Sequence, residues 1–198
     1  LINKYRATSD ILSSNFYKEN FEGTYLVDNS GEANSNSDAN VLISEIVIEG
    51  WEDHPEGRKL ELAAYDSMSI KPGSVINNQI LKKELDSIYA SGWFSGVKFK
   101  AEDGSLGVKL IVKIVPNPIL RQITLNPSNT IITQKYVNKI FDTYYGSTLN
   151  LNELQERINL IKKWYEERGY SIARVSGPER ISDNGSIQLN IDEGIVSE

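Results

Sequence analysis

The sequence predicts an α+β fold made of two tandem β-α-α-β-β modules, each a three-stranded mixed sheet covered on one face by two helices. One ordered series of signals occurs twice at a spacing of about 75 residues, as expected for a repeated supersecondary unit. In each copy a turn segment precedes an apolar-periodic run, a glycine-aromatic pair follows it, and an alternating strand closes the copy. The turn segments read Lys71-Pro72-Gly73-Ser74-Val75-Ile76-Asn77 and Tyr145-Gly146-Ser147-Thr148-Leu149-Asn150. A repeated small module favours a binding function over a single catalytic cleft.

Residues 1–40 are predicted to be a flexible N-terminal leader. Residues 28–40 hold no large apolar side chain and cannot offset the entropy lost on ordering. The chain begins at Leu1 with neither an initiator methionine nor a signal peptide, so we expect a fragment whose targeting sequence has been removed.

The first module is expected at residues 41–118 and begins with a strand. Residues 41–49 are rich in β-branched side chains and alternate with glutamates, which predicts a strand half exposed to water. Residues 58–70 carry apolar side chains at helical spacing, and Pro72-Gly73 ends that helix.

A second helix and a hairpin complete this module. Asn77 is suited to cap the helix and Gly92 to end it. Its apolar face consists of Leu81, Leu85 and Ile88. Two alternating strands then meet at a tight turn predicted at Asp103-Gly104.

The second module is expected at residues 119–196 and repeats the order. Residues 121–125 form a short strand, and the next helix has Tyr136, Val137, Ile140, Phe141 and Tyr144 on one face. Asn150 and Glu153 have capping-box spacing at the start of the following helix, which Gly169 ends. Its apolar stripe consists of Leu151, Leu154, Ile158, Ile161 and Tyr165. The turn Asp183-Asn184-Gly185 leads into the closing strand.

The two modules are joined by Pro116-Asn117-Pro118, which predicts a short, stiff connector because proline restricts the backbone.

The ordered set of motifs resembles the POTRA domain, the polypeptide-transport-associated module of outer-membrane β-barrel assembly proteins. The motifs are Pro72-Gly73, Gly92-Trp93-Phe94, Gly169-Tyr170 and Asp192-Glu193-Gly194, and the resemblance covers roughly residues 41–198. Ile88-Tyr89-Ala90-Ser91-Gly92-Trp93-Phe94 and Pro116-Asn117-Pro118-Ile119-Leu120-Arg121 look like the cyanobacterial and chloroplast branch. That branch carries three such modules ahead of a membrane barrel, so a third module and the barrel are expected beyond Glu193-Gly194.

The resemblance also implies where polypeptide would bind, namely at the second strand of each module, which forms an open sheet edge. These strands are residues 94–101 and 170–176, with Val97, Phe99, Ala173 and Val175 predicted to face inward. The candidate binding residues are Phe94, Val97, Lys98, Phe99, Ala101, Tyr170, Ala173, Arg174 and Val175. The alternative is that the apolar members are core residues and that the lysines and Arg174 protect the edge from aggregation.

Neither an enzyme nor a cofactor or metal site is predicted. The single histidine, His54, lies in a Pro/Glu-rich loop, and the carboxylates sit at turns or strand ends without the ligand spacing that calcium requires. The absence of cysteine excludes thiolate sites and disulfides. No apolar run approaches the roughly 20 residues of a membrane helix, so no direct membrane span is expected in this fragment.

The leading hypothesis is the periplasmic polypeptide-binding region of an outer-membrane assembly or translocation factor. It would receive unfolded outer-membrane proteins or preproteins, partly by strand addition, on the periplasmic side of the outer membrane or in the chloroplast intermembrane space. An alternative is the POTRA region of a two-partner secretion transporter. A KH-like RNA-binding module shares the element order, but it needs a Gly-x-x-Gly loop and a basic groove, whereas this chain has a net charge of -6.

Overall fold

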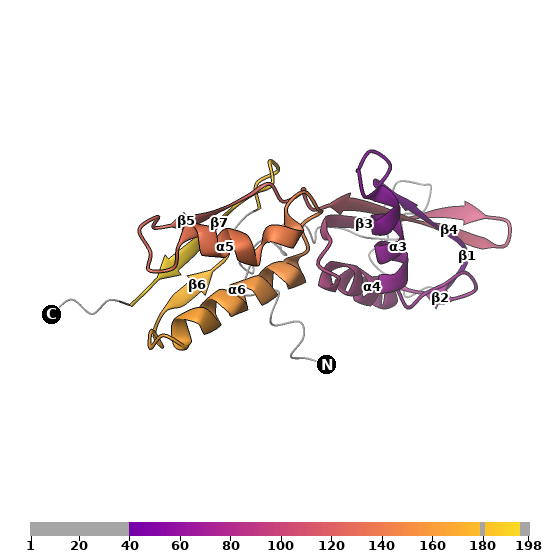
Figure 1. The fold of residues 1–198 in the computed structure, drawn as a ribbon. Helices are drawn as coiled ribbons and strands as arrows, with labels where there is room; N and C mark the ends of the chain where they lie inside the picture. The colour runs from indigo at the N-terminus through magenta and orange to yellow at the C-terminus, as the bar shows by residue number, and fades with distance from the viewer. Residues whose placement is uncertain (1–39, 179–180, 195–198) are drawn as a thin grey trace. The chain divides into compact units, whose positions relative to one another are not determined.

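The computed structural model describes residues 40–178 and 181–194, which form two compact units that divide between Pro116 and Asn117 (Figure 1). The predicted leader lies outside the described residues except for Asn40, as do the last four residues of the chain. The architecture is the predicted mixed α+β fold, with a mixed sheet in each unit.

The sheet of the first unit has the strand order β2-β1-β4-β3. Strand β1 runs parallel to β4, and β3 runs antiparallel to β4. Helices α3 and α4 lie over one face of this sheet (Figure 1). The elements are β1 (Val41–Glu49), α3 (Gly57–Ser67), β2 (Val75–Ile76), α4 (Asn78–Ala90), β3 (Phe94–Gly104) and β4 (Gly107–Pro116).

Alternation and capping explain these elements. Ile43 and Ile48 on β1 are buried, and the register of β1 with β4 shifts between Ile43 and Glu45. The Asn77 side chain accepts a hydrogen bond from the Ile80 N–H at the start of α4, and Gly92 follows its end with φ +81°. Leu81, Leu85 and Ile88 are buried, which confirms the predicted apolar face.

Three details of the first unit differ from the prediction. A fourth strand, β2, joins the sheet, because the segment before α4 pairs with the start of β1. Helix α3 stops at Ser67, and the buried Met68 and Ile70 pack from the loop that follows it. Strand β3 continues through Asp103 and Gly104, so the two turn residues are Ser105 and Leu106.

The second unit has the strand order β5-β7-β6, with β5 parallel and β6 antiparallel to the central β7. Helices α5 and α6 pack with the sheet around one apolar core (Figure 1). The elements are β5 (Gln122–Asn126), α5 (Gln134–Ile140), the 3-10 helix η1 (Asp142–Tyr144), α6 (Leu151–Glu166), β6 (Arg174–Ser176) and β7 (Ser186–Asp192).

Helix α6 follows its predicted pattern. The Asn150 side chain accepts hydrogen bonds from the N–H groups of Asn152 and Glu153, and all five residues of the predicted stripe are buried. Tyr165 is fully buried, and its hydroxyl donates to Glu193 Oε1 at 2.6 Å. The same carboxylate oxygen accepts from the Ile131 N–H at 2.6 Å, so Glu193 ties the last strand to the loop before α5.

Candidate polypeptide-binding edges

The border strands are β2 and β3 in the first unit and β5 and β6 in the second. Because β2 has two residues and pairs only with Val41 and Leu42, β1 forms the rest of that border. A border strand can present backbone N–H and C=O groups that lack a partner within the sheet. The chemistry of these borders therefore depends on what faces each strand on its outer side.

Strand β3 has the longest border. Gly104 pairs with Gly107 across a two-residue turn, and the antiparallel register continues through Lys98 opposite Lys113. In such a ladder, alternate residues exchange hydrogen bonds with the partner strand, and the residues between them point their backbone groups outward. Counting from the turn, the outward set is Asp103, Ala101, Phe99 and Val97.

One of these outward groups is already occupied within the unit. The Val97 N–H donates to the hydroxyl of Tyr89 on α4 at 3.0 Å, and both residues are buried. This hydrogen bond agrees with the register, because a Val97 amide paired with β4 could not also reach α4. Within the described residues, the N–H groups of Phe99 and Ala101 have no such partner.

The side chains of β3 alternate between core and solvent. Phe94, Val97 and Phe99 are buried, Ala101 is half-buried, and Lys98 and Lys100 are exposed. Lys100 Nζ lies 2.8 Å from Glu102 Oε1. This hydrogen bond raises the pKa of Lys100 and lowers the pKa of Glu102.

Strand β6 is much shorter than predicted. It contains only Arg174, Val175 and Ser176, so the prediction of a strand from residue 170 is wrong. Tyr170 and Ala173 belong to a turn, in which the Tyr170 N–H donates to Tyr165 O and the Ala173 N–H donates to Tyr170 O. Backbone groups committed to that turn cannot extend the ladder. Val175 is buried and Arg174 is exposed.

The border of β5 is covered by side chains from α5 and the following loop. Gln134 Nε2 donates to the Ile123 carbonyl oxygen at 2.9 Å and to Asn138 Oδ1 at 2.7 Å. The Tyr145 hydroxyl donates to Asn138 Oδ1 at 3.2 Å. Burial raises the pKa of Tyr145, and a hydrogen bond with the Ile123 backbone opposes this rise.

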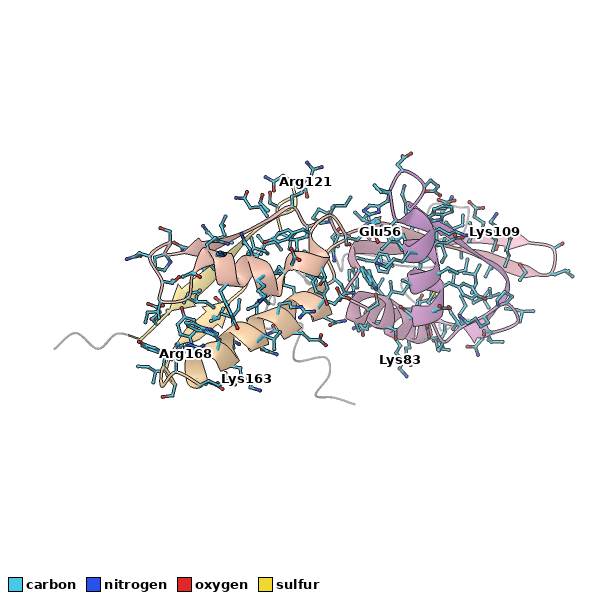
Figure 2. All side chains as sticks on the ribbon, viewed as in Figure 1. Glu56, Lys83, Lys109, Arg121, Lys163 and Arg168 are labelled. Atoms are coloured by element: carbon cyan, nitrogen blue, oxygen red, sulfur yellow. The ribbon has the colours of Figure 1, made fainter. Side chains whose placement is uncertain are left out.

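An open pocket of about 310 Å³ lies over this covered border. It is lined by residues 121–124, Gln134, Asn138 and Tyr145. Arg121 stands at its rim, and the side chain points outward into solvent (Figure 2). Gln134 and Tyr145 thus occupy backbone groups of Ile123 that an added strand would need, and Asn138 bonds to both of these side chains.

The described residues contain no group of three or more His, Asp or Glu side chains placed to hold a metal ion. His54 Nδ1 accepts a hydrogen bond from the Glu56 N–H at 3.2 Å, which gives this histidine a role in the loop before α3. No helix of the described part combines the length and apolar content needed to cross a bilayer.

The sequence did not indicate the residues that occupy the borders. Tyr89 stands next to the apolar stripe of α4, but its hydroxyl meets Val97 only because α4 packs beside β3. Gln134 and Asn138 have the spacing of one helical turn, which could have indicated a shared face but not its contact with β5.

The chain is similar to several known proteins. A family model described as "POTRA domain, ShlB-type" matches residues 119–194. The N-terminal domain of Omp85 from Thermosynechococcus elongatus is 35% identical with a TM-score of 0.71, over 81% of this chain and 66% of that chain. POTRA1-2 of the periplasmic domain of Omp85 from Anabaena is 32% identical with a TM-score of 0.68, over 81% of this chain and 100% of that chain.

Among curated relatives, the chloroplastic Outer envelope protein 80 of Arabidopsis thaliana is 27% identical over 82% of this chain and 22% of that protein. The chain therefore spans about a fifth of the length of this relative.

Proposed function

The chain belongs to the POTRA domains of the Omp85 family, and we propose that it binds polypeptide segments in extended conformation by strand addition. The observation that carries this proposal is the border of β3, an 11-residue strand whose outward N–H groups at Phe99 and Ala101 are available for pairing. An extended segment placed there would continue the sheet through main-chain hydrogen bonds.

Main-chain pairing suits clients of many sequences, because every residue except proline offers the same donor and acceptor. The proposed clients are unfolded outer-membrane proteins or preproteins. Of the predicted binding residues on β3, Phe99 and Ala101 are proposed to pair through their backbone. Phe94, Val97 and Lys98 are proposed to lie beside the paired segment. Binding rather than catalysis is the proposed role.

The second unit would contribute less to strand addition. Strand β6 offers only Arg174, Val175 and Ser176 for pairing, and the turn containing Tyr170 and Ala173 would limit its extension. Gln134 covers the opposite border at Ile123. We therefore propose β3 as the principal site and β6 as a short secondary one.

The proposed organisation is a leader at residues 1–40, a first POTRA domain at 41–118 and a second at 119–196. A third domain and a membrane β-barrel would follow in the complete protein. By analogy with the Omp85 relatives, this region would lie on the periplasmic side of the outer membrane or in the chloroplast intermembrane space. A two-partner secretion transporter is the alternative within the superfamily, and the continuation of the gene would decide, since such a transporter is expected to carry only two modules. The family assignment replaces the KH-like alternative.

The test is an NMR titration of the isotope-labelled chain with a synthetic peptide that copies a barrel strand. Amide shifts should map to residues 94–103, with smaller changes at 174–176. A peptide of the same composition with proline at alternate positions is the matched control, because it cannot form the ladder. Shifts confined to the helices or to β5, or equal shifts with the proline peptide, would contradict the proposal.

A further inference from the structure

We infer that Tyr89 sets the register of strand addition on β3, by occupying the Val97 N–H and leaving Phe99, Ala101 and Asp103 for the incoming chain. This inference rests on the proposed function and adds to it the position and length of the pairing segment. The ligand is an extended segment that pairs over about five residues, from position 99 to position 103.

The geometry allows Tyr89 to prevent an added strand from pairing at Val97. Its side chain is 7% exposed, and its hydroxyl accepts the Val97 N–H at 3.0 Å inside the unit. Only Ser91 to Trp93 separate the end of α4 from β3, so the ring has little freedom to swing away. Moving the ring would also leave a buried backbone N–H without a partner, which is unfavourable.

The other end of the register is set by the hairpin. Gly104 pairs with Gly107, and Ser105 and Leu106 turn the chain. A strand lying along β3 therefore has three outward residues available, at intervals of two, between the tyrosine and the turn. This spacing matches the alternation of main-chain donors and acceptors along an antiparallel partner.

The side chains beside this segment define the ligand further. Phe99 is buried and Ala101 half-buried on the helix side of the sheet, whereas Lys98 and Lys100 are exposed on the other side. An added strand would place alternate side chains next to these two surfaces. The favoured segment has apolar residues at alternate positions and polar residues between them.

The experiment is residue-resolved hydrogen exchange on the full chain, with and without a synthetic peptide of alternating valine and threonine. In the natural sequence, the peptide should slow exchange at least tenfold at the amides of Phe99, Ala101 and Asp103. It should leave the Val97 amide unchanged, because Tyr89 already protects it.

The decisive variant is Tyr89→Phe, which removes only the hydroxyl. Exchange at the Val97 amide should rise at least tenfold without peptide, and the peptide should then protect Val97 as well. Tyr65→Phe on α3 is the matched control and should leave the pattern of the natural sequence. Unchanged exchange at Val112 on the central strand would show that the unit remains folded.

Two results would overturn the inference while leaving the proposed function intact. One is protection of the Val97 amide by the peptide in the natural sequence. The other is an unchanged peptide footprint in Tyr89→Phe despite faster exchange at Val97, which would make the tyrosine a structural tie only. A peptide that protects no amide of β3 would overturn the proposed function together with this inference.

Discussion

The two units share one hydrogen-bonded frame and differ at its borders. In both, the segment before the longer helix forms two backbone hydrogen bonds of matching length, with a residue of β1 in the first unit and with a residue just before β5 in the second. These are Gly73 N to Ile43 O at 2.8 Å and Ile43 N to Ser74 O at 2.9 Å, against Gly146 N to Leu120 O at 2.8 Å and Leu120 N to Ser147 O at 2.9 Å. An asparagine side chain then caps the helix in each unit.

The borders differ in length and in cover. The first strand of the hairpin in the first unit, β3, has 11 residues, whereas its counterpart β6 has 3. The fold can accommodate this difference because the buried side chains of the central strands stabilise each unit. An outer strand pairs with only one neighbouring strand. One scaffold can therefore present an open border in the first unit and closed or short borders in the second.

The units also differ in the polar contact that the longer helix makes with the segment following the shorter helix. Glu84 and Arg157 each lie seven residues beyond the capping asparagine. Glu84 is 3% exposed, and its carboxylate accepts from the N–H and the hydroxyl of Ser69. Arg157 is half-buried and donates to the Tyr144 hydroxyl at 2.5 Å, while its Nε is buried with no hydrogen-bond partner in the described structure.

Substitutions at this polar contact are expected to have the largest effect on stability. Glu84→Ala should lower the free energy of unfolding of the first unit by about 3 kcal/mol, because the Ser69 N–H loses its buried acceptor and a cavity forms. Arg157→Ala should lower the free energy of unfolding of the second unit by only about 1 kcal/mol, since the buried Nε of this side chain has no hydrogen-bond partner in the described structure. Denaturant unfolding followed by residue-resolved hydrogen exchange would separate the units. Equal losses of unfolding free energy would show that the two contacts contribute equally to stability.

The next largest effect is a loss of stability of the second unit at alkaline pH. Burial, together with the hydrogen bond to Glu193, raises the pKa of Tyr165 well above its ordinary value. An unfolded tyrosine ionises near pH 10, whereas the folded one keeps its proton. The unit is therefore expected to lose stability as the pH rises above about 10.

Tyr165→Phe should lower the stability of the second unit by about 1–2 kcal/mol at neutral pH, through loss of the hydroxyl hydrogen bonds. It should also flatten the alkaline decline, leaving the smaller contribution of Tyr145, whose pKa is likewise raised. Unfolding midpoints measured at about pH 8 and about pH 11 test both statements. An alkaline decline of undiminished size in the variant would assign it to another group.

A smaller change would sharpen the contrast between borders. The double variant Gln134→Ala, Tyr145→Phe removes the side chains that cover β5, at a cost of about 1–2 kcal/mol. The Ile123 amide should then exchange faster, and a strand peptide should begin to protect β5. If the peptide still does not protect β5 from exchange, the shape of the border rather than its hydrogen bonds keeps the peptide from binding there.

The smallest effect on stability is expected from the lysines of β3. Lys98→Thr together with Lys100→Thr should leave the unfolding midpoint unchanged, since both side chains are exposed and the Lys100 pair with Glu102 is screened by water. The variant should nevertheless self-associate more, because charged side chains discourage pairing between borders of different molecules. Size-exclusion chromatography over a range of concentrations is the measurement. A variant that stays monomeric at every concentration would show that the two lysines do not protect the border against self-association.

The sequence by itself determined the repeat, the order of the two helices and three main strands in each unit, the helix caps at Asn77 and Asn150 and the buried stripe of α6. These depend on contacts among neighbours in the chain or on a period that can be counted along it. The length of a border strand cannot be counted in this way. Residues 170–176 carry a strand-like pattern, yet the Tyr170 N–H donates to Tyr165 O in α6 and the Ala173 N–H donates to Tyr170 O, so these residues form a turn and do not join the ladder.

Only the tertiary structure decided which backbone groups remain open. Tyr89 and Val97 are eight residues apart and belong to different elements, and Gln134 and Ile123 are eleven residues apart. Such contacts form when a helix settles on a particular part of a sheet, and that position results from packing the whole core. Local spacing therefore identified the modules, whereas the sites where another chain can pair depend on the three-dimensional arrangement of distant side chains.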